Sequence, residues 1–329
     1  MGTAKYLLGK LGQLLLTLLF VLTIAFLMFR VWMPGDPVKT YARSTGSKFT
    51  NAQLEEIRQE WGLDKPLFPD QYLDFMKGSL TFNFGFSTVL QPGVPVSTLF
   101  WERMGKSFIL IATSTIASVV IGVWLGIKGG WKRRGALDNT SMTTSMVLYA
   151  MPEFVLGMIL LLLLSNAVHL FPSGGYQTFG VTYTGVDHYV DVAKHMALPW
   201  LTLTLAYLGE FYLVMRSSLL DVLGEEYISL ARAKGVREKF VLRRHAVPNA
   251  LLPTITLVAL SFGFILGGVL TVELVFSYPG VGKLSVDALD ARDMPMLQAT
   301  FIISVLAVLI ANLVADLLYG YLDPRVRRA

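Results

Sequence analysis

Six apolar stretches alternate with polar segments along the chain, and this alternation is the strongest pattern in the sequence. The stretches cover residues 11–29, 107–127, 142–165, 197–215, 254–276 and 299–322. A helix needs about 20 apolar residues to cross the ~30 Å hydrocarbon core of a bilayer. The pattern therefore predicts an all-α integral membrane protein with six transmembrane helices.

The first stretch follows Lys5 and Lys10, and in this respect it begins like a secretory signal peptide. Its apolar part, residues 11–29, is longer than the roughly 7–15 residues of a typical signal. No A-x-A cleavage pattern follows it. We therefore interpret this stretch as a retained membrane helix.

Residues 30–106 form the only sizeable polar segment. Within it, Thr50 is a plausible N-cap for a helical pattern that ends near Trp61. A segment of this size cannot bury a large core of its own. We expect it to pack against the ends of the membrane helices.

The composition agrees with a membrane protein. Hydrophobic residues make up 53% of the chain and charged residues 16%, whereas a soluble domain carries about 25% charged residues. The chain has no cysteine, which excludes disulfides, cysteine nucleophiles and iron–sulfur clusters. Disordered, collagen-like and charged coiled-coil classes are excluded as well.

The basic residues predict the orientation in the membrane. Of the 28 lysines and arginines, sixteen lie at the N-terminus, in 128–134, in 216–244 and in the C-terminal tail. The two short loops on the opposite side hold three, and long segments such as 30–106 are outside the positive-inside rule. Both termini are therefore expected in the cytoplasm. The net charge of +5 is explained by this asymmetry, so we expect no nucleic-acid partner.

The sequence contains no complete motif of a known type of catalytic or metal site. Gly105-Lys106-Ser107 resembles the end of a phosphate-binding loop, but Phe100 stands where that motif needs its first glycine. The four histidines are scattered without metal-ligand spacing, which favours surface or interfacial positions. We expect no catalytic residue, metal site or cofactor in this chain.

Three carboxylates fall inside the apolar stretches: Glu153, Glu210 and Glu273. A charge at the centre of a bilayer costs roughly 3 kcal/mol on insertion scales, so such residues usually face a polar interior. Glu153 and Glu210 are candidates for lining a pathway where they would meet an ammonium group. The alternative is a structural hydrogen bond between helices, or a protonated acid. Glu273 lies near the outer end of its stretch and could be solvated.

The polar stretch around residues 224–246 predicts two short helices that are broken at Gly235. Tyr227, Leu230 and Ala231 would share a face of the first helix, and Val236 and Phe240 a face of the second. Helices this short are marginal alone and need a partner surface. Acidic residues among the basic ones weaken the alternative of a loop lying on anionic lipid. A docking element for a cytoplasmic protein fits better.

This stretch resembles the cytoplasmic "EAA" loop of ABC-transporter permeases. Ala231 matches the last alanine of that pattern, Gly235 its glycine, and His245-x-Val247-Pro248 its closing element. Ser229 and Leu230 depart from the first two positions. Residues 227–235, Tyr-Ile-Ser-Leu-Ala-Arg-Ala-Lys-Gly, match the form of the dipeptide/oligopeptide/nickel branch.

The resemblance extends over nearly the whole chain. Similar motifs are Pro34-Gly35-Asp36-Pro37, Gly62-Leu63-Asp64-Lys65-Pro66-Leu67, the run from Glu273 to Gly282, Ala291-Arg292-Asp293, and the ending from Asp316 to Arg327. Leu80-Thr81-Phe82-Asn83 departs mildly, where a Gly-Asp-Leu-Gly run is more usual.

The resemblance implies a type I permease fold and no enzymatic activity in this chain. The implied domains are helix 1 with its cytoplasmic end (1–33), an extracytoplasmic segment (34–100), the permease domain (101–322) and a cytoplasmic tail (323–329). The implied coupling residues are Glu226, Tyr227, Ala231, Arg232, Ala233, Lys234, Gly235 and Pro248.

The implied function is ATP-driven import of di- or oligopeptides across the plasma (inner) membrane of a bacterium or archaeon. The implied partners are a second, different permease subunit, two cytoplasmic ATPase subunits that hold ATP and magnesium, and an extracytoplasmic binding protein. Import of a nickel chelate or another small solute is an alternative. A secondary transporter that uses Glu153 and Glu210 as proton carriers is another.

Overall fold

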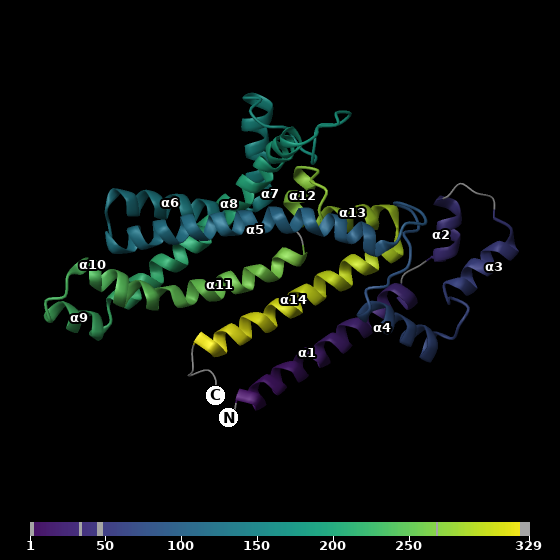
Figure 1. Ribbon diagram of the computed structural model, residues 1–329, viewed down its shortest axis with the longest axis horizontal. Coiled ribbons are helices and arrows are strands. Elements are labelled where there is room, and N and C mark those ends of the chain that lie inside the picture. Colours follow the sequence, from purple (N-terminus) through teal and green to yellow (C-terminus); the bar gives the residue numbers. More distant parts are fainter. Residues whose placement is uncertain (1–2, 33–34, 45–48, 268, 323–329) are drawn as a thin grey trace. The chain divides into compact units, whose positions relative to one another are not determined.

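The computed structural model describes residues 3–32, 35–44, 49–267 and 269–322, and within these ranges every regular element is helical (Figure 1). The tail 323–329, which the sequence predicts to be cytoplasmic, lies outside them. The elements are α1 (Thr3–Phe26), η1 (Leu27–Trp32), α2 (Pro37–Ser44), α3 (Asn51–Glu60), η2 (Leu67–Gln71), α4 (Tyr72–Leu80), α5 (Val96–Trp131), α6 (Ala136–Ala150), α7 (Glu153–Leu160), η3 (Leu161–Ala167), α8 (Val186–Leu223), α9 (Glu226–Ala233), α10 (Glu238–Phe240), η4 (Val241–Ala246), α11 (Val247–Gly267), α12 (Leu270–Val275), α13 (Val281–Ala291) and α14 (Met294–Leu322), where η marks a π-helical turn.

Four described helices are long and apolar enough to cross a membrane: Leu8–Trp32, Val96–Trp131, Val186–Leu223 and Met294–Val314. The predicted stretch 142–165 is a bent pair, Ala136–Ala150 and Glu153–Ala167, which meet at 106° and would make a fifth span. Pro152 stands at the bend, since a proline cannot donate the backbone hydrogen bond that would continue α6. The multi-pass helical class is confirmed, and the count of six stays a prediction.

Contacts divide the chain into two discontinuous units. The first unit comprises Met1–Ser107, Leu266–Gly268 and Pro279–Leu313. The second unit comprises Phe108–Ile265, Val269–Tyr278 and Val314–Ala329. The long helices α5 and α14 each contribute to both units.

In the first unit, the polar segment packs on the membrane helices, as expected. Phe26 near the end of α1 makes edge-to-face contacts with Tyr72 and Phe75 of α4, at centroid distances of 5.3 and 5.4 Å. The same apolar core includes Phe100 of α5 and Ile302 of α14. Burial of this shared face stabilises a segment that is too short to fold alone.

Side chains cap the helices of this segment. Thr50 caps α3 as predicted, in a capping box in which Gln53 N–H donates to Thr50 Oγ1 at 3.4 Å and Thr50 N–H donates to Gln53 Oε1 at 2.9 Å. Asp36 accepts from the backbone N–H of Val38 at 3.0 Å, which satisfies a free donor at the start of α2.

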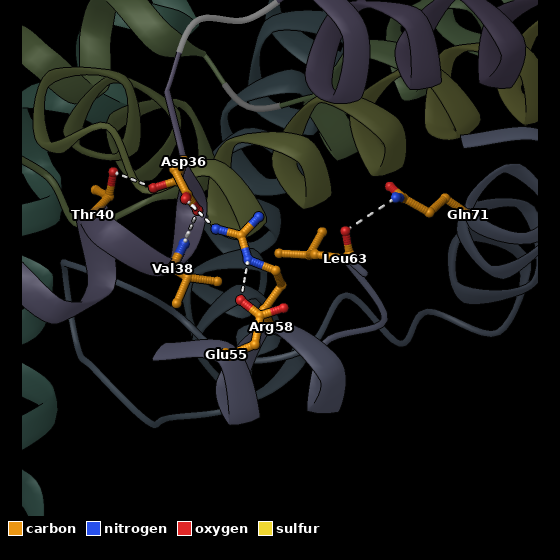
Figure 2. A network of polar contacts seen from close by, with 7 residues as sticks. All are labelled: Asp36, Val38, Thr40, Glu55, Arg58, Leu63 and Gln71. Atoms are coloured by element: carbon orange, nitrogen blue, oxygen red, sulfur yellow. Dashed lines mark hydrogen bonds and ion pairs between the residues drawn. The ribbon is translucent and has the colours of Figure 1, made fainter. Parts of the chain in front are cut away.

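The guanidinium of Arg58 joins α3 to this cap. It donates to the Asp36 carboxylate and lies 3.4 Å from Glu55 Oε2, as Figure 2 shows. In the same view, Gln71 Nε2 donates to the carbonyl of Leu63 at 3.4 Å. Asp36 therefore links the start of α2 to α3.

In the second unit, Gly122 and Gly126 lie on one face of α5 and let its backbone approach α8 closely. A Cβ added at Gly122 would lie 2.8 Å from Phe211 Cβ, and one at Gly126 would lie 2.9 Å from Met215 Cβ. Small residues at this spacing let two helices approach closely in a membrane. A hydrogen bond of 2.9 Å from Ser118 Oγ to the Thr204 carbonyl adds to this interface.

Candidate functional site

The segment between α8 and α11 contains the two short helices and the break that the sequence predicts. Helix α9 ends at Ala233, and Gly235 follows with a φ of +74°. Val236 N–H donates back across this glycine to the Ala231 carbonyl at 3.3 Å, which is the pattern of a glycine-terminated helix. No heavy atom outside the neighbouring residues lies within 4 Å of a Cβ added at Gly235. Glycine is therefore favoured here by the positive φ of the backbone, and not by a lack of room for a side chain.

The face of α9 that is buried within this chain is not the face of Tyr227 and Leu230, which the sequence predicts to meet a partner. Ile228 is fully buried in an apolar cluster with Met215 and Leu219 of α8, and with Val241, Ala246 and Ala250. Ala231 is half-buried against it, whereas the side chains of Tyr227 and Leu230 are 41% and 57% exposed. Ile228 and Ala231 are three residues apart and share a helix face, a spacing equally present in the sequence.

The exposed residues of α9 and α10 form a surface with apolar and charged members, which we call the α9–α10 surface. Tyr227, Leu230 and Phe240 are its exposed large apolar residues. Glu226, Arg232 and Ala233 of α9 are exposed as well, and so are Lys234 and Gly235 in the turn that follows α9, which we include in this surface. Because apolar side chains cost free energy in water, such a surface is typical of a site that a partner covers.

Polar contacts of residues in and beside this surface hold the turn in shape. Arg232 donates to both carboxylate oxygens of Glu238 across the turn, from Nε at 3.0 Å and from Nη2 at 3.3 Å. Asn249 Nδ2 donates to the Tyr227 hydroxyl at 3.2 Å. Pro248 is exposed in the first turn of α11, where a missing N–H is tolerated.

A buried ion pair that the sequence did not reveal ties α6 to α8 in the same unit. Asp138 is 1% exposed. Arg216 Nε and Nη2 donate to its two carboxylate oxygens at 2.5 and 2.8 Å. The Tyr212 hydroxyl donates to the same carboxylate at 3.1 Å, and Arg134 N–H donates to it at 2.9 Å. The polar capacity of this carboxylate is thus largely satisfied.

The two candidate pathway carboxylates both lie in the second unit. Glu153 begins α7 and accepts a hydrogen bond of 2.8 Å from the Thr271 hydroxyl of α12. Glu210 is half-buried in α8. A structural hydrogen bond is therefore present at Glu153, and a pathway role for either residue stays a prediction.

Three other sequence interpretations change or gain detail. Glu273 is fully buried and not solvated, because α12 packs on α7 and α8. His195 is also buried, with Nδ1 2.9 Å from the Asp191 carbonyl.

Gly105-Lys106-Ser107 lies within the regular helix α5, not in a loop that could surround a phosphate. Among the described residues, no group of three His, Cys, Asp or Glu side chains is placed to hold a metal ion.

In the first unit, one buried carboxylate organises a loop. Asp293 is fully buried and accepts from the Ser87 hydroxyl and from the backbone N–H groups of Thr88, Val89 and Leu90 at 3.0–3.1 Å. Burial raises the pKa of this carboxyl, but these hydrogen bonds outweigh it and hold the pKa below its ordinary value. The stabilisation is therefore present at neutral pH and is lost as the pH falls through the lowered pKa.

Two family descriptions together match nearly the whole chain. "Binding-protein-dependent transport system inner membrane component" matches residues 118–328, and its N-terminal companion matches residues 3–96. A glutathione transport system permease protein of Pectobacterium atrosepticum is 36% identical over 98% of this chain and 99% of its own length. An oligopeptide permease protein of Bacillus subtilis and a dipeptide permease protein of Lactococcus lactis are 33% and 35% identical over the same shares.

Proposed function

The chain belongs to the family of binding-protein-dependent transport system inner membrane components, and we propose that it forms half of the translocation pathway of an ATP-driven peptide importer. The observation that carries this proposal is the similarity over 98% of the chain to permease proteins named for glutathione, oligopeptides and dipeptides. The chain is a transport subunit and not itself an enzyme. Di- and oligopeptides are its proposed substrates.

The proposed complex contains a second, different permease subunit, two cytoplasmic ATPase subunits that bind ATP and magnesium, and an extracytoplasmic binding protein. The α9–α10 surface supports the ATPase contact, because it presents Tyr227, Leu230 and Phe240 to the exterior on a well-packed base. Closure of the ATPases would then move this element. The spans would change between inward- and outward-facing states.

Uptake of short peptides tests the proposed substrate. In a strain without other peptide transporters, deletion of this subunit is expected to abolish uptake of labelled di- and oligopeptides, and the intact chain should restore it. Normal peptide uptake in the deletion strain, with loss of nickel-chelate uptake, would instead favour the alternative substrate. Failure of the ATPases to co-purify with the chain would favour a secondary transporter.

The topology is tested with single cysteines, since the natural chain has none. We propose that residues 34–100 lie outside the cell, and that 128–138, 216–246 and both termini lie in the cytoplasm. In intact cells an impermeant thiol reagent should label Asn83→Cys, whose native side chain is exposed. Lys234→Cys should react only after permeabilisation. The opposite labelling pattern would invert the topology.

A further inference from the structure

A cavity of about 380 Å³ lies within the first unit, where the first membrane helix ends. Volumes of about 300–1,000 Å³ are typical of sites for small organic ligands. Its walls come from η1, from the residues that follow α3, from α4, from the loop before α5 and from the start of α14. Aromatic side chains line much of it, including Phe29, Trp61, Phe75 and Phe84.

The guanidinium of Arg30 is the unusual member of this lining. Its side chain is half-buried, and it makes no hydrogen bond or ion pair in the part of the chain that the structure describes. The one carboxylate in the lining, Asp74, is already paired with Lys65 Nζ at 2.7 Å. A desolvated charge without a partner is costly. Among the described residues, the cavity therefore has a positive charge without a matching negative one, against an aromatic wall.

The position of Arg30 along the membrane helix indicates which anion is close to it. The apolar helix Leu8–Trp32 has 25 residues, or about 37 Å at 1.5 Å per residue. This length exceeds the ~30 Å hydrocarbon core, so Arg30, in its last turn, lies at the level of the lipid headgroups. Trp32 is 66% exposed, as is typical of tryptophans at the membrane–water interface.

We propose that this cavity binds the phosphate group of a phospholipid. A guanidinium donates two parallel hydrogen bonds to phosphate oxygens and is less strongly hydrated than an ammonium group. The side-chain amides of Asn83 and Gln298 in the lining supply further donors. The acyl chains would continue along the exposed apolar side of α1, where Leu19 and Phe20 are 57% and 62% exposed. This binding is independent of the peptide specificity proposed above.

Native mass spectrometry of the full chain, released from nanodiscs that contain phosphatidylglycerol, tests the site. We expect a phospholipid to stay bound to the wild type, and Arg30→Gln to weaken its retention by about tenfold, the equivalent of one charge-assisted contact. Arg30→Lys should retain an intermediate amount, because it keeps the charge but not the planar donor pair. Lys77→Gln is the matched control, since it removes an exposed charge of α4 outside the lining.

A second variant keeps the test valid if Arg30→Gln folds poorly. Asn83 is exposed at the cavity, so Asn83→Trp should fill it and prevent lipid retention while Arg30 is intact. Thermal stability provides a separate measurement: soluble dihexanoyl phosphatidylglycerol should raise the Tm of the wild type, and dihexanoylglycerol, which lacks the phosphate, should not.

Three outcomes would overturn the proposal. Equal phospholipid retention by Arg30→Gln and the wild type would show that the guanidinium does not bind the lipid. An equal Tm shift with dihexanoylglycerol would show that the phosphate is not recognised. Displacement of the lipid by dialanine at low concentration would assign the cavity to a peptide carboxylate instead.

Discussion

Gly235→Val is expected to abolish transport while the chain still reaches the membrane at its normal level. Gly235 has a φ of +74°, a conformation in which a side chain with a branched Cβ is strained by about 1–3 kcal/mol. The turn would relax and move α9 relative to α10. Uptake of labelled peptide and the amount of ATPase that co-purifies with the chain should then both fall to background.

Control variants distinguish the effect of backbone strain at Gly235 from the effect of simply adding a side chain there. Gly235→Asn should keep most of the transport, because asparagine tolerates a positive φ and the surrounding space is open. Leu230→Asp changes an exposed residue, so it should leave the fold intact and weaken ATPase binding. Ala231→Asp places a charge beside the buried apolar cluster and should do the same or worse.

A loop that lies on lipid would behave differently. In that case Gly235→Val and Leu230→Asp would be tolerated, and neutralising the exposed Arg243 and Arg244 would abolish function. Wild-type transport by both Gly235→Val and Leu230→Asp, with the ATPases still bound, would disprove the assignment of this segment as the ATPase-coupling element.

The second large effect is expected at the buried ion pair between α6 and α8. Asp138→Ala should destabilise the chain by about 3–5 kcal/mol, because it leaves the guanidinium of Arg216 without its buried partner. The measurement is thermal unfolding of the purified chain in detergent. Glu238→Ala is the matched control, since it breaks the exposed pair with Arg232 and should cost less than about 1 kcal/mol.

A double-mutant cycle completes this test. Replacing both partners, as in Asp138→Leu with Arg216→Met, removes the unpaired charge and should recover much of the lost stability. If the losses from the single variants Asp138→Leu and Arg216→Met simply add in the double variant, the pair makes no specific contribution.

The sequence predicts the parts of the fold that depend on local chemistry. The apolar stretches mark the helices, Thr50 marks the start of α3, and Gly235 marks the break after α9. The bend at Pro152 is not specified by the apolar pattern, because a proline can interrupt a helix but does not determine an angle of 106°.

Contacts between distant residues are what sequence reasoning missed. Arg216 counts in the sequence as one of many topogenic basic residues, and nothing local joins it to Asp138, 78 residues away. Nothing in the local sequence indicates that Ile228 is the residue through which α9 packs on α8. Glu273 is buried because α12 packs on α7 and α8, which its place near the end of an apolar stretch does not indicate.

The Asp293 contacts have a consequence for biosynthesis. The backbone N–H of Thr88 is satisfied by a carboxylate 205 residues further along the chain. At about 5–20 residues per second, a ribosome needs roughly 10 to 40 s to synthesise that stretch. During this interval the loop that ends before α5 is already made and lacks its acceptor. The first unit is therefore completed only after most of the second has been translated, so the N-terminal region is not a module that matures first.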